Sequence, residues 1–226
     1  MRLGNPSKLE VQRSYAELSA AGQSVLDVGA NVGHFTQLCL DQNASKVVAL
    51  EMNPTVFSSL RQNYDDAVEL HNCAVTSWDG ADSVVTAARY LRPSGIEVTG
   101  LGTVKEVNTG RLVRRFSRFT KETYDVQGKA LKPFTEAVNI IKMDIEGSEL
   151  DILTDAVFPQ TVHTLFVEFH VRRYEDGEEK YQMCRQRLLE QGFDGELHHE
   201  KTGEAYGTLE ANVTSPADYF CVRLTR

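Results

Sequence analysis

The segment that most restricts the fold of this chain is residues 25–36, VLDVGANVGHFT. An apolar β run that contains Asp27 is followed by a turn with Gly29 and Gly33, and then by a helical pattern. Glycine allows the tight turn and close backbone approach that such a strand–turn–helix unit needs. Asn31 is of a residue type that tolerates left-handed backbone angles. The segment predicts the first βα unit of a doubly wound α/β fold, in which ligands bind at the carboxyl ends of the strands.

Further strands and helices alternate along the chain, which favours a mostly parallel, seven-stranded Rossmann-like sheet within one domain, residues 1–226. We expect an N-terminal helix within residues 1–22, and an insertion at residues 81–136 before the fourth core strand. This insertion is expected to cap the substrate site and to contain a hairpin near residues 104–112. Strands are expected at residues 24–28, 46–51, 67–75, 138–144, 161–169 and 218–224, the last as an edge strand, and helices at residues 33–42, 148–156, 177–191 and from residue 54.

The composition restricts the partners that this chain can have. The formal net charge of −8 argues against nucleic acid or an anionic membrane as the main partner. No apolar run has the roughly 18 residues of a membrane span, and the N-terminal sequence lacks a signal-peptide pattern. We therefore expect a cytoplasmic protein whose four scattered cysteines are reduced. Whether it forms a homodimer is left open.

One stretch departs from this acidic balance. Residues 89–121 carry eight basic residues against two acids, which indicates either a solvated face or a surface for an anionic substrate. The basic residues are Arg89, Arg92, Lys105, Arg111, Arg114, Arg115, Arg118 and Lys121.

The charges around the glycine turn indicate which cofactor it binds. Gly29 and Gly33 do not have the GxGxxG spacing of dinucleotide sites, and Asp27 would repel a pyrophosphate. A carboxylate there suits the cationic groups of S-adenosylmethionine, and Glu51, 24 residues later, can accept hydrogen bonds from ribose hydroxyls. The expected cofactor-binding residues are Asp27, Gly29, Ala30, Asn31, Gly33, His34, Glu51, Met52, Asn53, Asn72, Cys73, Ala74 and Asp144.

At this point the sequence resembles the FkbM family of methyltransferases. The motifs that carry the resemblance are LDVGANVGHFT (26–36), VVALEMNP (47–54), HNCAVTSWDG (71–80), IIKMDIEGSELDIL (140–153) and FVEFH (166–170). The resemblance implies a class I methyltransferase fold and transfer of a methyl group from S-adenosylmethionine to oxygen, often a hydroxyl of a sugar or natural product. The long basic insertion before Val138 departs from the family pattern and puts the substrate class in doubt.

Candidate catalytic residues lie where the fourth and fifth core strands end. His170 is the candidate general base, because an ordinary imidazole pKa near 6.5 suits that role. Asp144 is expected to orient the cofactor or the acceptor, with helix capping as the alternative for Asp144, Glu146 and Glu149. Lys142, inside an apolar strand, needs a carboxylate partner, for which Asp144 or Glu168 is expected. The spacing of these residues does not require a metal, but Asp144, Glu168 and His170 together could hold a divalent cation.

Three functions remain to be compared. The first is O-methylation of a small molecule. The second is methylation of RNA or protein through the basic segment 89–121, and the third is a non-catalytic module that binds the cofactor. A dehydrogenase is disfavoured by the glycine spacing and by Asp27.

Overall fold

The computed structural model of this 226-residue chain describes residues 15, 17–94, 120–171, 175–199, 204–211 and 220–226. Most of the expected N-terminal helix therefore lies outside the described residues, and residues 18–20 are not helical. The hairpin expected at residues 104–112 also lies outside them. No helix in the described part of the chain combines the length and the apolar character that crossing a bilayer requires.

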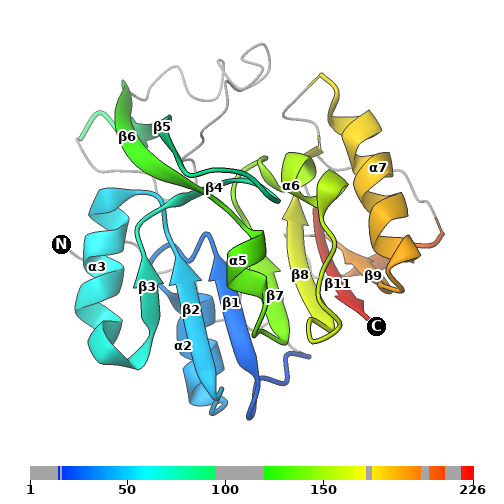
Figure 1. The fold of residues 1–226 in the computed structure, drawn as a ribbon. Coiled ribbons are helices and arrows are strands. Elements are labelled where there is room, and N and C mark those ends of the chain that lie inside the picture. Colours follow the sequence, from blue (N-terminus) through cyan, green and yellow to red (C-terminus); the bar gives the residue numbers. More distant parts are fainter. Residues whose placement is uncertain (1–14, 16, 95–119, 172–174, 200–203, 212–219) are drawn as a thin grey trace.

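The central sheet confirms the predicted α/β class. Its strand order is β10-β9-β11-β8-β7-β1-β2-β3, and β8, β7, β1, β2 and β3 are parallel neighbours (Figure 1). It has eight strands rather than the seven expected. The strands are β1 (Ser24–Val28), β2 (Lys46–Leu50), β3 (Glu69–His71), β7 (Ile140–Met143), β8 (Thr164–Phe169), β9 (Asp194–His198), β10 (Ala205–Thr208) and β11 (Phe220–Thr225).

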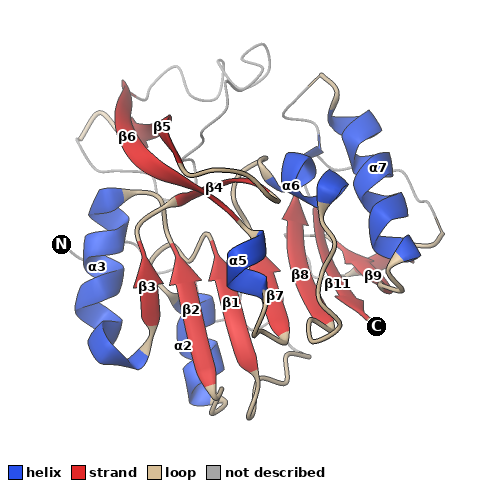
Figure 2. Ribbon diagram, viewed as in Figure 1, coloured by secondary structure: helices blue, strands red, loops and turns tan. Residues whose placement is uncertain are grey.

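Helices cover both faces of this sheet, as a doubly wound fold requires (Figure 2). Because side chains alternate along a strand, Val25 of β1 packs on one face and Leu26 on the other. The Val25 face packs against α2 (His34–Asp41) and α3 (Pro54–Tyr64), and the Leu26 face packs against α6 (Glu149–Asp155) and α7 (Gly177–Glu190). A short 3-10 helix, Asp65–Ala67, follows α3.

The third predicted strand, residues 67–75, is wrong as a single element. The chain forms β3, leaves the central sheet at Asn72 and Cys73, and enters a second sheet as β4 (Ala74–Ser77). This sheet has the order β4-β6-β5, with β5 (Ser83–Leu91) antiparallel to β6 (Thr120–Ala130). Much of the predicted insertion is thus a long hairpin at the carboxyl end of the central sheet (Figure 1), followed by α5 (Lys132–Thr135).

The last strand also differs from the prediction. β11 is not an edge strand, because it pairs antiparallel with β8 on one side and β9 on the other. The edge is formed by β10, which pairs with β9 in a hairpin that the sequence analysis did not predict. Alternate residues of β11, including Phe220, Val222 and Leu224, are fully or nearly fully buried, which fits an interior position.

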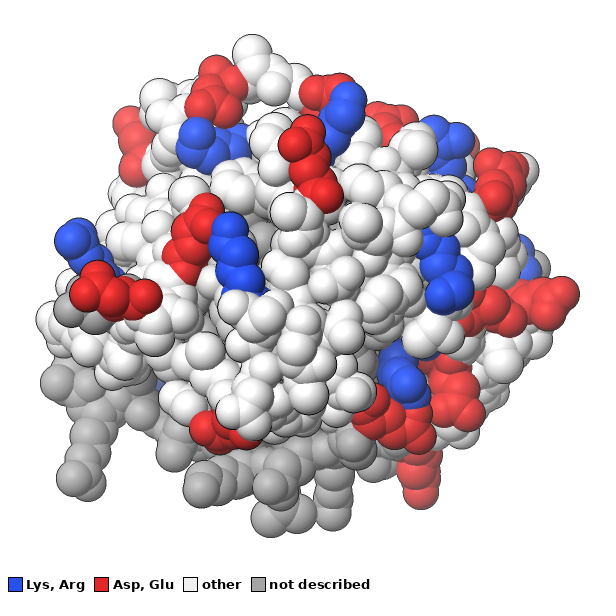
Figure 3. Space-filling model, turned by 60° about the horizontal axis from the view of Figure 1, so that its bottom comes forward, with Lys and Arg blue, Asp and Glu red and all other residues white. Residues whose placement is uncertain are grey.

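Charged side chains are mixed over the surface. On the face shown in Figure 3, acidic and basic side chains lie next to one another in small groups. Several described lysines are paired with acids, among them Lys129 with Asp82 and Lys132 with Asp79. The described residues on this face form no continuous basic patch of the kind that nucleic acid requires.

Candidate active site

The turn after β1 has the unusual backbone that its sequence predicted. Gly29, Asn31 and Gly33 all have positive φ angles, of 77°, 51° and 91°. A Cβ atom at Gly29 would lie 2.0 Å from the carbonyl oxygen of Asp144, and one at Gly33 would lie 2.3 Å from the Tyr64 ring. Both glycines are therefore required by close packing as well as by backbone angle.

Two polar atoms of this turn are shielded from solvent and have no hydrogen-bond partner among the described residues. They are Oδ1 of Asn31 and Nε2 of His34, the first residue of α2. Burial lowers the pKa of His34, which favours a neutral ring. Because a buried polar atom without a partner is costly, this pair marks a place where a polar ligand would be stabilised.

Glu51 follows β2 and holds the turn from the side. Its Oε2 accepts a hydrogen bond from the backbone N–H of Asn31 at 2.8 Å, and its Oε1 accepts one from the N–H of Asn53 at 2.8 Å. Burial raises the pKa of Glu51, although these two hydrogen bonds oppose the shift. The Asn72 side-chain amide donates to the carbonyl oxygens of Glu51 and Met52. The structure thus brings together the acid and the turn that the sequence analysis paired.

Other predicted cofactor residues have identifiable packing roles. Asn53 caps α3, because its Oδ1 accepts hydrogen bonds from the N–H groups of Thr55 and Val56. Cys73 is buried in the larger core cluster, and burial raises the pKa of its thiol to about 11. Met52 packs against the cluster that contains Ala74. Ala30 is buried directly beside the turn. Contact of these residues with a cofactor stays a prediction.

Asp27 lies under the turn, and the cation beside it is Lys142. Oδ1 of Asp27 is 3.3 Å from Nζ of Lys142, and Oδ2 accepts a hydrogen bond from the Thr36 hydroxyl at 2.7 Å. Nζ of Lys142 also donates to the carbonyl oxygen of Gly29 at 2.7 Å. The expectation that Asp144 or Glu168 would pair with Lys142 is wrong, because Asp27 and Lys142 are direct neighbours in the β1–β7 register. Both side chains are buried, so the pair holds the turn from below.

A second polar cluster lies past the ends of β7 and β8. The ligand-capable atoms of Asp144, Glu146 and His170 all lie within 4.8 Å of one another. Nε2 of His170 is 3.3 Å from Glu168 Oε1 and 3.5 Å from Glu146 Oε2. On the other side of the ring, Nδ1 is 2.9 Å from Glu149 Oε1.

We call Asp144, Glu146, Glu149, Glu168 and His170 the acid-rich cluster. The backbone between β7 and α6 turns sharply to form it. Glu146 has a φ of 62° and Gly147 a φ of 115°. The N–H of Gly147 donates to Oε2 of the fully buried Glu149 at 2.7 Å, and the N–H of His170 donates to its Oε1 at 2.7 Å. Glu149 therefore joins the two strand ends and orients the imidazole.

The electrostatics of this cluster change the role expected for His170. Burial alone would lower its pKa, but the charge and hydrogen bonds of Glu149, with Glu168 and Glu146, hold the pKa well above 6.5. The surrounding carboxylates therefore favour the charged form of the ring, and the role of His170 as general base stays a prediction. Burial and the neighbouring Glu168 raise the pKa of Asp144 to about 8, against the opposing charge of Lys142.

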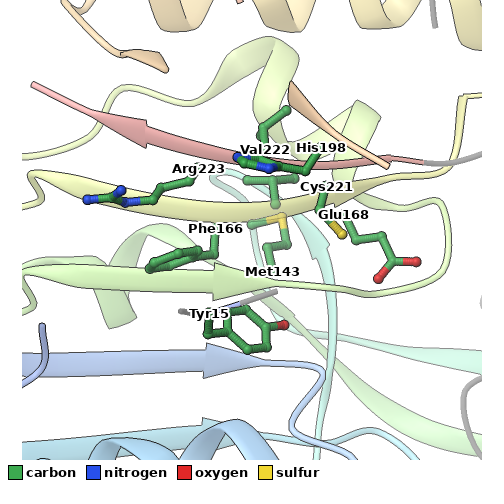
Figure 4. A pocket seen from close by; sticks show the side chains of 9 residues that line it. Tyr15, Met143, Phe166, Glu168, His198, Cys221, Val222 and Arg223 are labelled. Atoms are coloured by element: carbon green, nitrogen blue, oxygen red, sulfur yellow. The ribbon is translucent and has the colours of Figure 1, made fainter. Parts of the chain in front are cut away.

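Tyr15 lies close to this cluster from the opposite end of the sequence. Its ring packs against Phe35 and Phe166, at centroid distances of 4.8 and 5.5 Å. Figure 4 shows its hydroxyl directed toward the strand ends, as is the carboxylate of Glu168. The adjoining cavity, of about 20 Å³, has room for one water molecule but not for a cofactor. Burial and the charge of Asp144 raise the pKa of Tyr15 well above 10.

The sequence analysis missed four residues that shape the site: Thr36, Tyr64, Glu149 and Tyr15. Glu149 carries a signal in the sequence, since it is the third acid of the run DIEGSE, in which a glycine permits a turn back toward the strand ends. It was interpreted only as a helix-capping residue. The contacts of Tyr64 and Tyr15 join residues that are far apart in the sequence. Thr36 bonds to Asp27, nine residues before it, within the strand–turn–helix unit, where its role was not predicted.

Comparison with known proteins yields several similarities. Residues 27–194 match the family described as the methyltransferase FkbM domain. The hexuronic acid methyltransferase AglP of Haloferax volcanii is 28% identical over 168 residues, which are 71% of this chain and 62% of that protein. Methyltransferase 1 of Beauveria bassiana is 23% identical over 142 residues, which are 57% of this chain and 56% of that protein. The chain therefore spans about three fifths of the length of these curated relatives.

A solved structure shares the fold. The crystal structure of a methyltransferase FkbM from Methylobacillus flagellatus KT has a TM-score of 0.50 and 13% identity, over 95% of this chain and 48% of that chain. At this identity the likeness shows the fold alone. This chain therefore has a known fold. Its glycine turn lies between β1 and α2, and its polar groups lie at the ends of neighbouring strands.

Proposed function

Because this chain belongs to the FkbM family of methyltransferases, we propose that it transfers a methyl group from S-adenosylmethionine to a hydroxyl oxygen of a small molecule such as a sugar. The observation that carries this proposal is the close contact between Gly29 and Asp144, which joins the glycine turn and the acid-rich cluster at one edge of the sheet. A cofactor held at the turn and an acceptor held at the cluster would then be neighbours.

The residues around the turn fit the cofactor. When bound, S-adenosylmethionine supplies a methyl group that is activated by a positively charged sulfur. Asn31 and His34 each present a shielded polar atom without a partner among the described residues, and each would gain a hydrogen bond from a bound ligand. Glu51 would accept hydrogen bonds from ribose hydroxyls in addition to its two backbone bonds, because each carboxylate oxygen has two lone pairs.

The acid-rich cluster would position the acceptor and remove its proton. As the acceptor oxygen forms its bond to the methyl carbon, the carbon–sulfur bond breaks and the hydroxyl proton passes to a carboxylate of the cluster. Holding the oxygen close and in line supplies much of the acceleration of such a displacement. We assign His170 to orientation rather than to proton removal, because three carboxylates already hold its two ring nitrogens and favour its charged form.

A sugar is the acceptor class that the relatives favour. One relative is described as acting on a hexuronic acid, and that likeness motivates a uronic acid as the first acceptor to test. No described contact favours a macromolecular acceptor. Arg89, in the basic segment, donates hydrogen bonds to Glu122 and to the Thr55 hydroxyl, so part of this segment is held within the protein.

Two measurements on the purified protein test the proposal. Calorimetry should detect binding of S-adenosylhomocysteine, and Glu51→Gln should weaken it by roughly 10-fold because a charged acceptor of the ribose hydroxyls is lost. Labelled S-adenosylmethionine should then transfer its methyl group to uronic acid glycosides or neutral sugars. Absence of cofactor binding would reject the proposal. Binding without turnover on either sugar class, but with turnover on RNA or protein, would reject the acceptor class.

A further inference from the structure

The three groups that converge past β7 and β8 have the composition of a metal site. Asp144 and Glu146 offer carboxylate oxygens and His170 offers an imidazole nitrogen, and these atoms lie within 4.8 Å of one another. A single cation placed among them would be a neighbour of all three, and bonds in such sites are usually about 2.0–2.3 Å long. Three protein ligands leave coordination positions open for water or for a substrate oxygen.

The environment of His170 supports this interpretation independently of the number of acids. A metal-bound histidine almost always gives its second ring N–H to a carboxylate, which fixes the tautomer and the orientation of the ring. Here Oε1 of the fully buried Glu149 is 2.9 Å from Nδ1 of His170 and accepts the backbone N–H of the same residue at 2.7 Å. This arrangement directs Nε2 toward Asp144 and Glu146 and would keep the proton on Nδ1 when Nε2 binds a cation.

Asp144 supplies a further observation. Its Oδ1 is shielded from solvent and has no hydrogen-bond partner among the described residues. A carboxylate oxygen in that position is costly unless a donor or a cation reaches it. The nearest lysine, Lys142, is engaged by Asp27 and by the carbonyl oxygen of Gly29.

Several carboxyl groups surround His170. Its ring nitrogens lie within 3.5 Å of three carboxylates, those of Glu149, Glu168 and Glu146. Asp144 adds a fourth carboxylate to the same group. A divalent cation would bring positive charge to this group of carboxyl groups.

We propose that Asp144, Glu146 and His170 bind one divalent cation of the Mn²⁺ type, with Glu149 as the positioning residue behind His170. Carboxylate donors suit Mn²⁺, and imidazole is a donor for divalent transition metals, so this mixed set fits a transition-metal cation better than it fits Mg²⁺ or Ca²⁺. The second part of this inference rests on the proposed function: the cation binds the acceptor hydroxyl at an open position. It then stabilises the oxygen as its proton leaves to a carboxylate of the cluster and its bond to the methyl carbon forms.

The first experiment measures the cation without any acceptor or cofactor. The full chain is stripped with a chelator and dialysed, and Mn²⁺ is titrated while electron paramagnetic resonance records the free ion. The wild-type protein is expected to bind about one Mn²⁺ per chain. Glu146→Gln and His170→Gln should each weaken binding at least 10-fold, and Glu149→Gln should weaken it by about 10–100-fold although it removes no ligand.

The chain offers a matched control. Glu196 precedes His198 at the same spacing as Glu168 precedes His170, and its Oε2 is 3.4 Å from Nε2 of His198, but 58% of the Glu196 side chain is exposed. Glu196→Gln should leave Mn²⁺ binding unchanged. Circular dichroism and binding of S-adenosylhomocysteine, measured on every variant, exclude loss of the fold. If His170→Gln fails to fold, the partly exposed Glu146 still decides the question through Glu146→Gln.

The results separate this inference from the proposed function. Mn²⁺ binding that is lost in Glu146→Gln and kept in Glu196→Gln supports the cation site, whether or not a methyl acceptor is found. No Mn²⁺ binding by the wild-type protein, or equal binding by wild type and Glu146→Gln, overturns it. In that case retained binding of S-adenosylhomocysteine would leave the proposed methyltransferase function standing.

Discussion

Two charged regions meet at the carboxyl edge of the central sheet, and they are built in opposite ways. Beneath the turn, Asp27 and Lys142 form one buried pair of opposite charges, in which Asp27 also accepts from Thr36 and Lys142 also donates to the Gly29 carbonyl. Past β7 and β8, several carboxyl groups surround the single imidazole of His170. The buried pair balances its own charges, whereas the cluster would be stabilised by a group that brings positive charge. The comparison separates a structural ion pair from a candidate active site.

The largest effect is expected from breaking the balanced pair. Lys142→Met leaves Asp27 buried without a cation and should lower the free energy of unfolding by about 3–5 kcal/mol. Urea denaturation followed by circular dichroism measures this change. The double variant Asp27→Asn with Lys142→Met should recover part of the loss, because no uncompensated charge remains. Additive effects of the two substitutions would contradict direct pairing.

A smaller loss is expected at the contact that joins the two regions. Gly29→Ala places a Cβ atom 2.0 Å from the Asp144 carbonyl oxygen, on a backbone with a φ of 77°. We expect a loss of about 1–3 kcal/mol in stability, together with loss of S-adenosylhomocysteine binding because the turn must shift. Gly22→Ala is the matched control, since Gly22 also has a positive φ of 71° but has open space around it. Equal losses in both variants would show that backbone angle alone is responsible.

The smallest change in stability is expected in the acid-rich cluster, and there it is not a loss. Asp144→Asn removes a carboxyl group whose charged form is disfavoured by burial and by Glu168, so stability measured in a chelating buffer should be unchanged or rise by up to about 1 kcal/mol. Methyl transfer should nevertheless be lost. A drop in stability as large as that of Lys142→Met would mean that Asp144 is a structural residue of the same kind as Asp27.

The sequence was sufficient for the parts of the molecule that local patterns determine. The β1–turn–α2 unit, the parallel order of the neighbouring strands and the placement of Glu51 beside the turn all follow from residue types at short spacing. The positive φ of Asn31 and Gly33 follows from the same pattern. These features depend on residues that are close to one another along the chain.

Features that depend on register between distant strands were not predictable in the same way. Lys142 pairs with Asp27 because β7 lies beside β1 with these residues opposite each other, although they are far apart in sequence. The break between β3 and β4 is also hidden, because residues 67–75 read as one continuous strand, whereas two different sheets share them. The raised pKa of His170 depends on three carboxylates from two different segments, Glu146 and Glu149 after β7 and Glu168 within β8.

The pairing of β5 with β6 has a consequence for how proteins of this kind diversify. Nine consecutive residue pairs join the two strands, and the last pair is Leu91 with Thr120. The two ends of the segment 92–119 are therefore anchored side by side on one ladder, whatever the length of the chain between them. Recombination could replace that segment with a longer or shorter one without altering the distance between its junctions. Such an exchange would leave the glycine turn and the acid-rich cluster unchanged.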